Sequence, residues 1–211
     1  EVLEEIAREG DTTPELRLRL AARAYTHTAE YDMAIAAYMR REAGLSEKLF
    51  LSFERTQELR YGENPHQRAA FYREADEVPY SLASARQLHG KELSYNNIQD
   101  ANAALELLRE FDDPCCVAVK HMNPCGTALG ADAADAWRRA YEADPVSIFG
   151  GIVALNRPLT REAAAAMKPV FLEIVIAPAF EPEALELLAA KKNLRLLTVR
   201  MDADTAPARQ L

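Results

Sequence analysis

The sequence predicts an α/β fold preceded by helices, and two observations support this prediction. After about residue 50, short apolar runs alternate with helical stretches, which is typical of a mostly parallel or mixed sheet with helices on its faces. The runs are continuously apolar, as expected of strands that are buried on both faces of a sheet. The predicted strands are residues 115–119, 152–155, 174–177 and 194–199, and the predicted helices lie near 100–110, 132–143, 160–168 and 181–192.

The first 45 or so residues are predicted to be helical. Thr13 followed by Pro14 is typical of a helix start, because proline lacks an N–H group that would find no partner there. Apolar residues then recur at intervals of three and four, which gives a helix an apolar face. They are Leu16, Leu20, Ala24, Tyr31, Ala34, Ile35 and Tyr38. Such a face needs a partner surface, either elsewhere in this chain or in a domain that these helices close off.

Composition and charge exclude several classes of protein. The 211 residues are 49% hydrophobic and 27% charged, which argues against wholesale disorder and against a fibrous fold. A net charge of −8 gives nucleic-acid phosphates no general attraction, so no nucleic-acid partner is expected. No segment approaches the roughly 18 consecutive apolar residues that a membrane span needs, so no membrane partner is expected either.

The ends of the chain and its cysteines suggest a cytoplasmic fragment. The chain begins with Glu1 rather than Met, and the acidic residues that follow are unlike a signal peptide, so we expect a piece of a longer protein. The three cysteines include no CxxC pair, which argues against a disulfide scaffold and suits a reducing cytosol. The acidic, proline-containing tail after Met201 is expected to fray or to lead elsewhere.

Three polar segments, residues 59–67, 90–97 and 120–126, carry more functional side chains than a loop needs. In the first, Arg60 is either a solvated charge in a turn or a guanidinium fork for a phosphate or carboxylate, with Tyr61 stacking on a ring. In the second, residues 94–97 either read a heterocycle with their amides or cap a helix that begins just after them. The residues alone leave both pairs of alternatives open.

The third segment places Lys120 and His121 directly after a predicted strand, where α/β sheets bind ligands in loops that lead into helices. An imidazole accepts a proton near neutral pH, and an ammonium group stabilises an oxyanion. Gly126 and Gly130 would let the backbone approach a ligand closely. For a bare Lys-His dipeptide, however, a strand end that returns to solvent is the more common explanation.

A zinc site is also suggested by the third segment, because zinc deaminases use an H-x-E segment and a P-C-x-x-C turn. Here Met122 and Asn123 follow His121, and no second cysteine lies three residues after Cys125. The ligands for zinc are therefore missing, so we predict no metal and disfavour a deaminase-like hydrolase.

Five motifs in one order resemble the bifunctional purine biosynthesis family, which combines AICAR transformylase with IMP cyclohydrolase. They are LRYGENPHQ, GKELSYNNIQDANAAL, VAVKHMNPCGTALG, DPVSIFGGIVALNR and FLEIVIAPAF, and the resemblance covers essentially the whole chain. It implies that residues 49–211 form the N-terminal half of the transformylase domain, with a cytidine-deaminase-like three-layer α/β fold. Residues 1–48 would be the C-terminal helices of the cyclohydrolase domain and a linker.

The resemblance also implies a reaction and its residues. A formyl group moves from the cosubstrate 10-formyltetrahydrofolate to the 5-amino group of the AICAR nucleotide, and the other domain then closes the ring to IMP. His121 would accept the proton and Lys120 would stabilise the transition state, with nucleotide contacts from Arg60, Tyr61, Asn97, Gly150 and Glu173. His66 would either assist or make an internal hydrogen bond.

Further expectations concern what lies outside this chain. The folate-binding residues are expected in the second half of the transformylase domain, and the family forms its transformylase site in a homodimer. Because that half is missing here, an alternative is a fragment that binds the nucleotide but does not turn it over.

Overall fold

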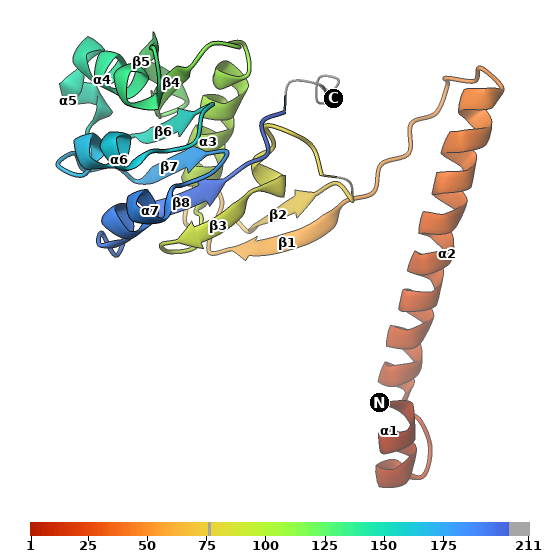
Figure 1. Cartoon of the computed structure of the whole chain (residues 1–211). Coiled ribbons are helices and arrows are strands. Elements are labelled where there is room, and N and C mark those ends of the chain that lie inside the picture. The colour runs from red at the N-terminus through yellow and green to blue at the C-terminus, as the bar shows by residue number, and fades with distance from the viewer. Residues whose placement is uncertain (76, 203–211) are drawn as a thin grey trace. The chain divides into compact units, whose positions relative to one another are not determined.

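The computed structural model of the chain describes residues 1–75 and 77–202, and it divides into two compact units, residues 1–52 and 53–211 (Figure 1). The tail for which fraying is predicted lies, from residue 203 on, outside the described residues. Each unit is described by itself.

The first unit consists of α1 (Val2–Glu9) and α2 (Pro14–Glu42). The Thr13 hydroxyl accepts a hydrogen bond from the Leu16 N–H at 3.2 Å, which confirms the predicted helix start. One continuous helix then carries the whole predicted apolar stripe. Within this stripe Leu16 is buried, whereas Tyr31 and Tyr38 are exposed.

The second unit is built on a six-stranded mixed sheet with the order β3-β8-β7-β6-β4-β5. Its strands are β3 (Arg86–His89), β4 (Cys115–Lys120), β5 (Asn123–Leu129), β6 (Ile152–Leu155), β7 (Ile174–Ala177) and β8 (Arg195–Thr198). Strands β6, β7 and β8 are parallel, β4 is antiparallel to both β5 and β6, and β3 is antiparallel to β8. The predicted α/β class is confirmed, and each of the four predicted apolar runs coincides closely with a strand.

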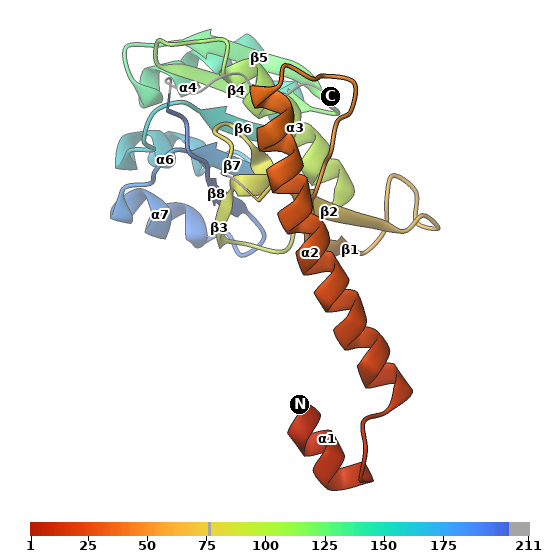
Figure 2. The same ribbon diagram turned by 90° about the vertical axis from the view of Figure 1, so that its right-hand side faces the viewer.

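Helices cover both faces of this sheet. They are α3 (Tyr95–Leu108), α4 (Ala133–Ala143), α5 (Pro145–Ile148), α6 (Arg161–Met167) and α7 (Pro182–Ala189). Figure 2 shows α3 on one side of the strands and α6 and α7 on the other. A small sheet of β1 (Glu54–Leu59) and β2 (Ala69–Arg73) and a short 3-10 helix (Leu82–Ser84) complete the unit.

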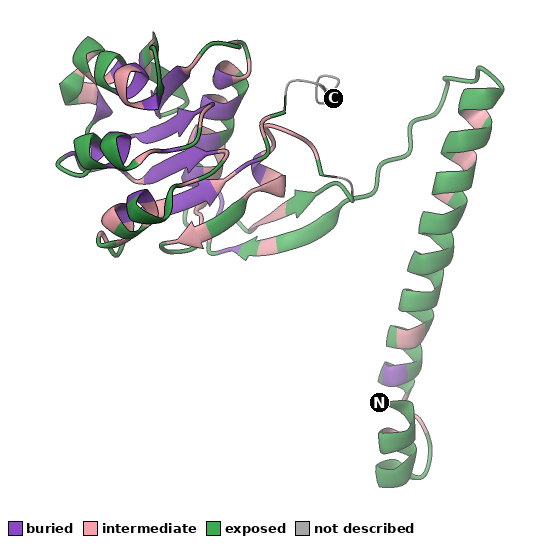
Figure 3. Ribbon diagram, viewed as in Figure 1, coloured by how far each residue is buried: buried purple, intermediate pink, exposed green. Residues whose placement is uncertain are grey.

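The central strands are buried (Figure 3), and the alternation of their side chains creates two hydrophobic cores. On β4, Cys116 and Ala118 pack in the core that includes α4, α6 and α7, whereas Val117 and Val119 pack in the core that includes α3. Both faces of the central strands are thus buried, which explains why their sequences are continuously apolar.

The structure corrects the expectation that Lys120 and His121 begin a loop that leads into a helix. Strand β4 turns directly into the antiparallel strand β5, with only His121 and Met122 between them. Gly126 and Gly130 also have a different role from the one predicted. An added Cβ would lie 2.4 Å from the Ala140 oxygen and 2.2 Å from the Ala136 nitrogen, respectively, so these glycines let α4 approach rather than a ligand.

Asn156 connects the end of β6 to the segment before β4. Its Oδ1 accepts a hydrogen bond from the Cys115 N–H at 2.8 Å, and its Nδ2 donates to the Phe111 and Asp113 carbonyls at 2.9 and 2.8 Å. The residue is only 6% exposed. One side chain therefore satisfies three backbone groups that the buried sheet would otherwise leave without water or partners.

We expect Asn156→Ala to lower the free energy of unfolding by about 2–4 kcal/mol, because each buried group left unsatisfied costs about 1–3 kcal/mol. Urea denaturation followed by circular dichroism measures this change. Asn102→Ala, which removes an exposed asparagine, is the matched control and should change stability by less than about 0.5 kcal/mol. Equal losses in the two variants would contradict this account of Asn156.

Candidate functional site

Antiparallel pairing brings several polar segments to one edge of the main sheet. Val119 of β4 pairs with Ile152 of β6, and Ile174 of β7 pairs with Arg195 of β8. The C-terminal end of β4 therefore lies at the same edge as the N-terminal ends of β6, β7 and β8. This edge carries five of the residues assigned from the resemblance, namely Lys120, His121, Asn97, Gly150 and Glu173.

His121 lies at the tip of the β4–β5 hairpin in an unusual conformation. His121 and Met122 have φ angles of 53° and 62°, as in a type I′ turn, although neither is glycine. A left-handed conformation costs about 1–2 kcal/mol for each such residue. The Asp100 carboxylate accepts hydrogen bonds from both N–H groups, at 3.3 Å from His121 and 2.8 Å from Met122. Asp100 of α3 thus holds the backbone of the tip, while the His121 side chain is exposed.

Lys120 is held close to the loop that precedes β6. Its Nζ donates a hydrogen bond to the Phe149 carbonyl at 2.9 Å, which uses one of the three donors of the ammonium group. The next residue, Gly150, has a φ of 78°, and its N–H group donates to the Phe171 carbonyl at 2.8 Å. The half-buried Lys120 therefore presents its remaining N–H donors beside Gly150.

Asn97 performs the capping role that the sequence left open. It forms a capping box with Ser94 at the start of α3, with both hydrogen bonds at 3.2 Å. Its Nδ2 also donates to Glu173 Oε2 at 2.8 Å, and Arg195 lies 4.0 Å from the same oxygen. Because Asn97 is 5% exposed and the Glu173 side chain 43%, Asn97 orients a carboxylate that remains open to a ligand.

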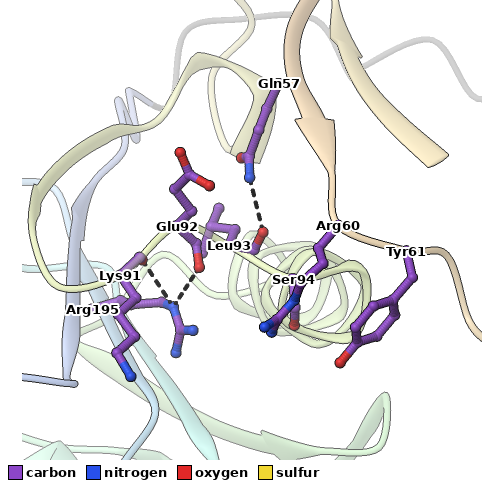
Figure 4. Close-up of a pocket in the computed structure, with 8 residues that line it drawn as sticks. All are labelled: Gln57, Arg60, Tyr61, Lys91, Glu92, Leu93, Ser94 and Arg195. Carbon is purple, nitrogen blue, oxygen red and sulfur yellow. Dashed lines mark hydrogen bonds between the residues drawn. The ribbon is translucent and has the colours of Figure 1, made fainter. Parts of the chain in front are cut away.

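Arg60 and Tyr61 line a pocket of about 360 Å³ (Figure 4). The other lining residues are Gln57, Lys91, Glu92, Leu93, Ser94 and Arg195. Figure 4 shows Arg60 and Tyr61 on one side of this pocket and Lys91 and Arg195 on the other. The lining has three cationic side chains and one carboxylate, so an anion is the ligand that it favours.

Two arginines in this pocket are already oriented. The Arg60 guanidinium lies 5.2 Å from the centre of the Tyr61 ring, within the range of a cation–π contact. Arg195 Nε donates to the Lys91 and Glu92 carbonyls at 3.1 and 3.2 Å. Burial lowers the pKa of Arg195 and the nearby Glu173 opposes this shift, but a guanidinium stays protonated in proteins.

Sequence reasoning missed Lys91, Asp100 and Arg195. Asp100 lies three residues after Asn97 on one helix face, a spacing that could have identified it. Lys91 lies within the polar segment 90–97, but no local pattern distinguishes it from an ordinary surface lysine. Arg195 contacts carbonyls more than 100 residues earlier in the chain, so no local pattern could reveal it. His66 is exposed in the turn between β1 and β2.

The cysteines do not provide a nucleophile. Burial raises the pKa of Cys115 to about 11. It also raises the pKa of Cys116 well above its ordinary value and raises the pKa of Cys125. Thiols in such surroundings stay protonated and unreactive. Within residues 1–75 and 77–202, no group of three or more His, Cys, Asp or Glu side chains could hold a metal ion. No helix in this described part is both long and apolar enough to cross a membrane.

Comparison with known proteins identifies the relatives of this chain. The family model described as AICARFT/IMPCHase bienzyme matches residues 1–211. The bifunctional purine biosynthesis proteins PurH of Bacillus cytotoxicus and Bacillus mycoides are each 53% identical over 212 residues. These alignments cover 100% of this chain but only 42% of each relative, so the chain spans less than half of their length. The chain therefore belongs to the AICARFT/IMPCHase bienzyme family.

Proposed function

We propose that this chain provides the nucleotide-binding and catalytic side of an AICAR transformylase in purine biosynthesis. The supporting observation is that Lys120 and His121, in a hydrogen-bonded hairpin, share one edge of the sheet with Gly150, Glu173 and Arg195. The relatives are named as bifunctional purine biosynthesis proteins, which agrees with this proposal. The cosubstrate is 10-formyltetrahydrofolate, and its binding residues lie in the second half of the transformylase domain.

The proposed reaction requires a base for the attacking amine and a positive charge beside the tetrahedral oxyanion. The 5-amino group of AICAR is a poor nucleophile, because its lone pair is delocalised into the imidazole and carboxamide. His121 accepts a proton from this nitrogen as the nitrogen attacks the formyl carbon, and the Lys120 ammonium stabilises the tetrahedral oxyanion. The bond from the formyl carbon to the folate nitrogen then breaks, and that nitrogen takes up a proton. The products are FAICAR and tetrahydrofolate.

Nucleotide binding is assigned to the pocket and the neighbouring edge. Arg60 binds the phosphate, with Lys91 and Arg195 increasing the positive potential, and Tyr61 contacts the nucleotide beside it. Glu173 accepts hydrogen bonds from the nucleotide, and Asn97 acts mainly by holding Glu173. Gly150 offers a close backbone approach because it has no side chain. No metal takes part in this proposal.

The remaining assignments extend the proposal to the complete protein. Residues 1–48 are the C-terminal helices of the cyclohydrolase domain and a linker, and residues 49–211 the first half of the transformylase domain, with a cytidine-deaminase-like fold. The boundary between the compact units, after Ser52, lies close to this division. IMP cyclohydrolase activity belongs to the complete protein, which we place in the cytoplasm as a homodimer without nucleic-acid or membrane partners.

We expect His121→Ala in the complete protein to reduce formyl transfer by at least about 100-fold, because general base catalysis contributes roughly that factor or more. The affinity for AICAR nucleotide should stay within a few fold, since its phosphate is bound by Arg60. Stopped-flow assays and titration calorimetry measure the two quantities. His27→Ala, which removes an exposed histidine of α2, is the comparison. Near-wild-type turnover by His121→Ala would exclude His121 as the base.

We expect Arg60→Ala to weaken nucleotide binding by about 2–4 kcal/mol, the cost of removing one partner of a desolvated charge pair. Arg60→Lys should cause a smaller loss, because an ammonium group cannot form a bidentate contact with phosphate. The dephosphorylated nucleoside should lose much less affinity than the nucleotide.

Titration of both ligands against each variant tests this assignment. Arg55→Ala is a matched control, because Arg55 is an exposed arginine of β1 that lies outside the pocket. Equal losses for nucleotide and nucleoside would show that Arg60 does not bind the phosphate.

We expect the complete protein to sediment as a dimer at the concentrations at which it is active. Phe149 and Phe171 pack against each other with ring centres 5.2 Å apart, yet they are 58% and 49% exposed beside Gly150. A second subunit would cover such an apolar surface. Sedimentation velocity with an activity assay at the same nanomolar concentration is the measurement, and a fully active monomer would contradict the homodimer.

A further inference from the structure

We propose that Asp100 is a positioning residue, which fixes the conformation of the His121 hairpin tip through two backbone hydrogen bonds. The inference rests on the proposed function, because formyl transfer is the reaction in which His121 acts. Asp100 itself belongs to α3, whereas the tip belongs to the β4–β5 hairpin, and 21 residues separate Asp100 from His121 along the chain.

The two oxygens of one carboxylate are both used. Asp100 Oδ1 accepts from the Met122 N–H at 2.8 Å, and Oδ2 accepts from the His121 N–H at 3.3 Å. On the other side of the turn, Asn123 Nδ2 donates to the His121 carbonyl at 2.7 Å. Hydrogen bonds to an ionised acceptor are stronger than those between neutral groups. The backbone of His121 is therefore held by side chains on both sides.

The local sequence does not favour this turn. Type I′ turns prefer Asn-Gly or Gly-Gly at their two central positions, because both residues need positive φ angles. Here the two positions are His121 and Met122, which pay a steric cost that glycine would avoid. An external contact is needed to stabilise such a conformation, and the Asp100 carboxylate is that contact.

Helix α3 is a rigid support for this contact. Its start is fixed by the capping box of Ser94 and Asn97, and Ala101 and Ala104 are fully buried against the sheet. Asn97 and Asp100 lie three residues apart, on neighbouring turns of one helix face. Because Asn97 holds Glu173 while Asp100 holds the His121 tip, α3 sets the position of the proposed base relative to the proposed nucleotide contact.

Asp100 is also poorly placed for a merely helical role. It is the sixth residue of α3, beyond the first turn in which an acidic side chain stabilises a helix N-terminus. Its carboxylate contacts the hairpin backbone instead. Removing it should therefore affect the hairpin more than the helix.

The first experiment measures Asp100→Ala in the complete protein. We expect kcat for formyl transfer to fall about 10- to 100-fold, as is typical when a catalytic group is displaced by about 1 Å. The dissociation constant of the nucleotide should change less than about threefold. Asp100→Asn, which keeps one acceptor oxygen, should give a smaller loss of kcat. Glu110→Gln, a change of an exposed acidic residue just after α3, is the control and should behave as wild type.

The second experiment distinguishes positioning of the tip from a general loss of stability. Asp100→Ala is introduced into the wild type and into a Met122→Gly background. Glycine adopts the left-handed conformation at little cost, so the loss of kcat should fall from about 10- to 100-fold to less than about threefold. A merely structural Asp100 would cause the same loss in both backgrounds.

A third measurement does not depend on activity. With methionine methyl groups labelled with ¹³C, the Met122 signal should shift or broaden in Asp100→Ala and remain unchanged in Glu110→Gln. If the wild type transfers no formyl group, the proposed function is wrong, and this signal still tests the contact. If the wild type is active but Asp100→Ala keeps kcat within threefold, or leaves the Met122 signal unchanged, the positioning role alone is overturned.

Discussion

The antiparallel pairing of β4 with β6 is the constraint on which the candidate site depends. Were β4 parallel to β6, its C-terminal end would lie at the opposite edge of the sheet from Gly150, Glu173 and Arg195. The antiparallel register instead places Lys120 beside the segment that begins β6. The two-residue hairpin to β5 then leaves His121 at a tip, where its imidazole faces solvent rather than the core.

A net acidic protein that binds an anionic nucleotide needs local cations. The charge of −8 repels phosphate over the molecule as a whole, and screening confines that repulsion to about 10 Å at ordinary ionic strength. Arg60, Lys91 and Arg195 line one pocket and can dominate the potential within it. We therefore assign the energy of the proposed nucleotide binding to directional contacts within this pocket.

The α/β class could be predicted from the sequence because the central strands β4, β6, β7 and β8 are largely buried on both faces. Such strands read as continuous apolar runs, and the predicted runs and helices fall close to the observed elements. Thr13 and the cap of α3 were predictable because capping is local. The direction of β4 was not, because a parallel and an antiparallel central strand have the same apolar sequence. That ambiguity explains the error over the loop after Lys120 and over Gly126 and Gly130, which pack against α4.

The site residues are of two kinds, namely buried residues that support others and presented groups that are open to a ligand. Asn97 and Arg195 are largely buried and hydrogen-bond within the protein, whereas His121, Arg60 and the Glu173 carboxylate are open to solvent. Motifs identified the presented groups together with Asn97, while Asp100 and Arg195 required the three-dimensional arrangement. A histidine or lysine side chain open to solvent is ordinarily mobile, and its average position is then of little use for catalysis. Here hydrogen bonds already hold the backbone of His121 and the ammonium group of Lys120. These two residues therefore lose less conformational entropy when a ligand binds.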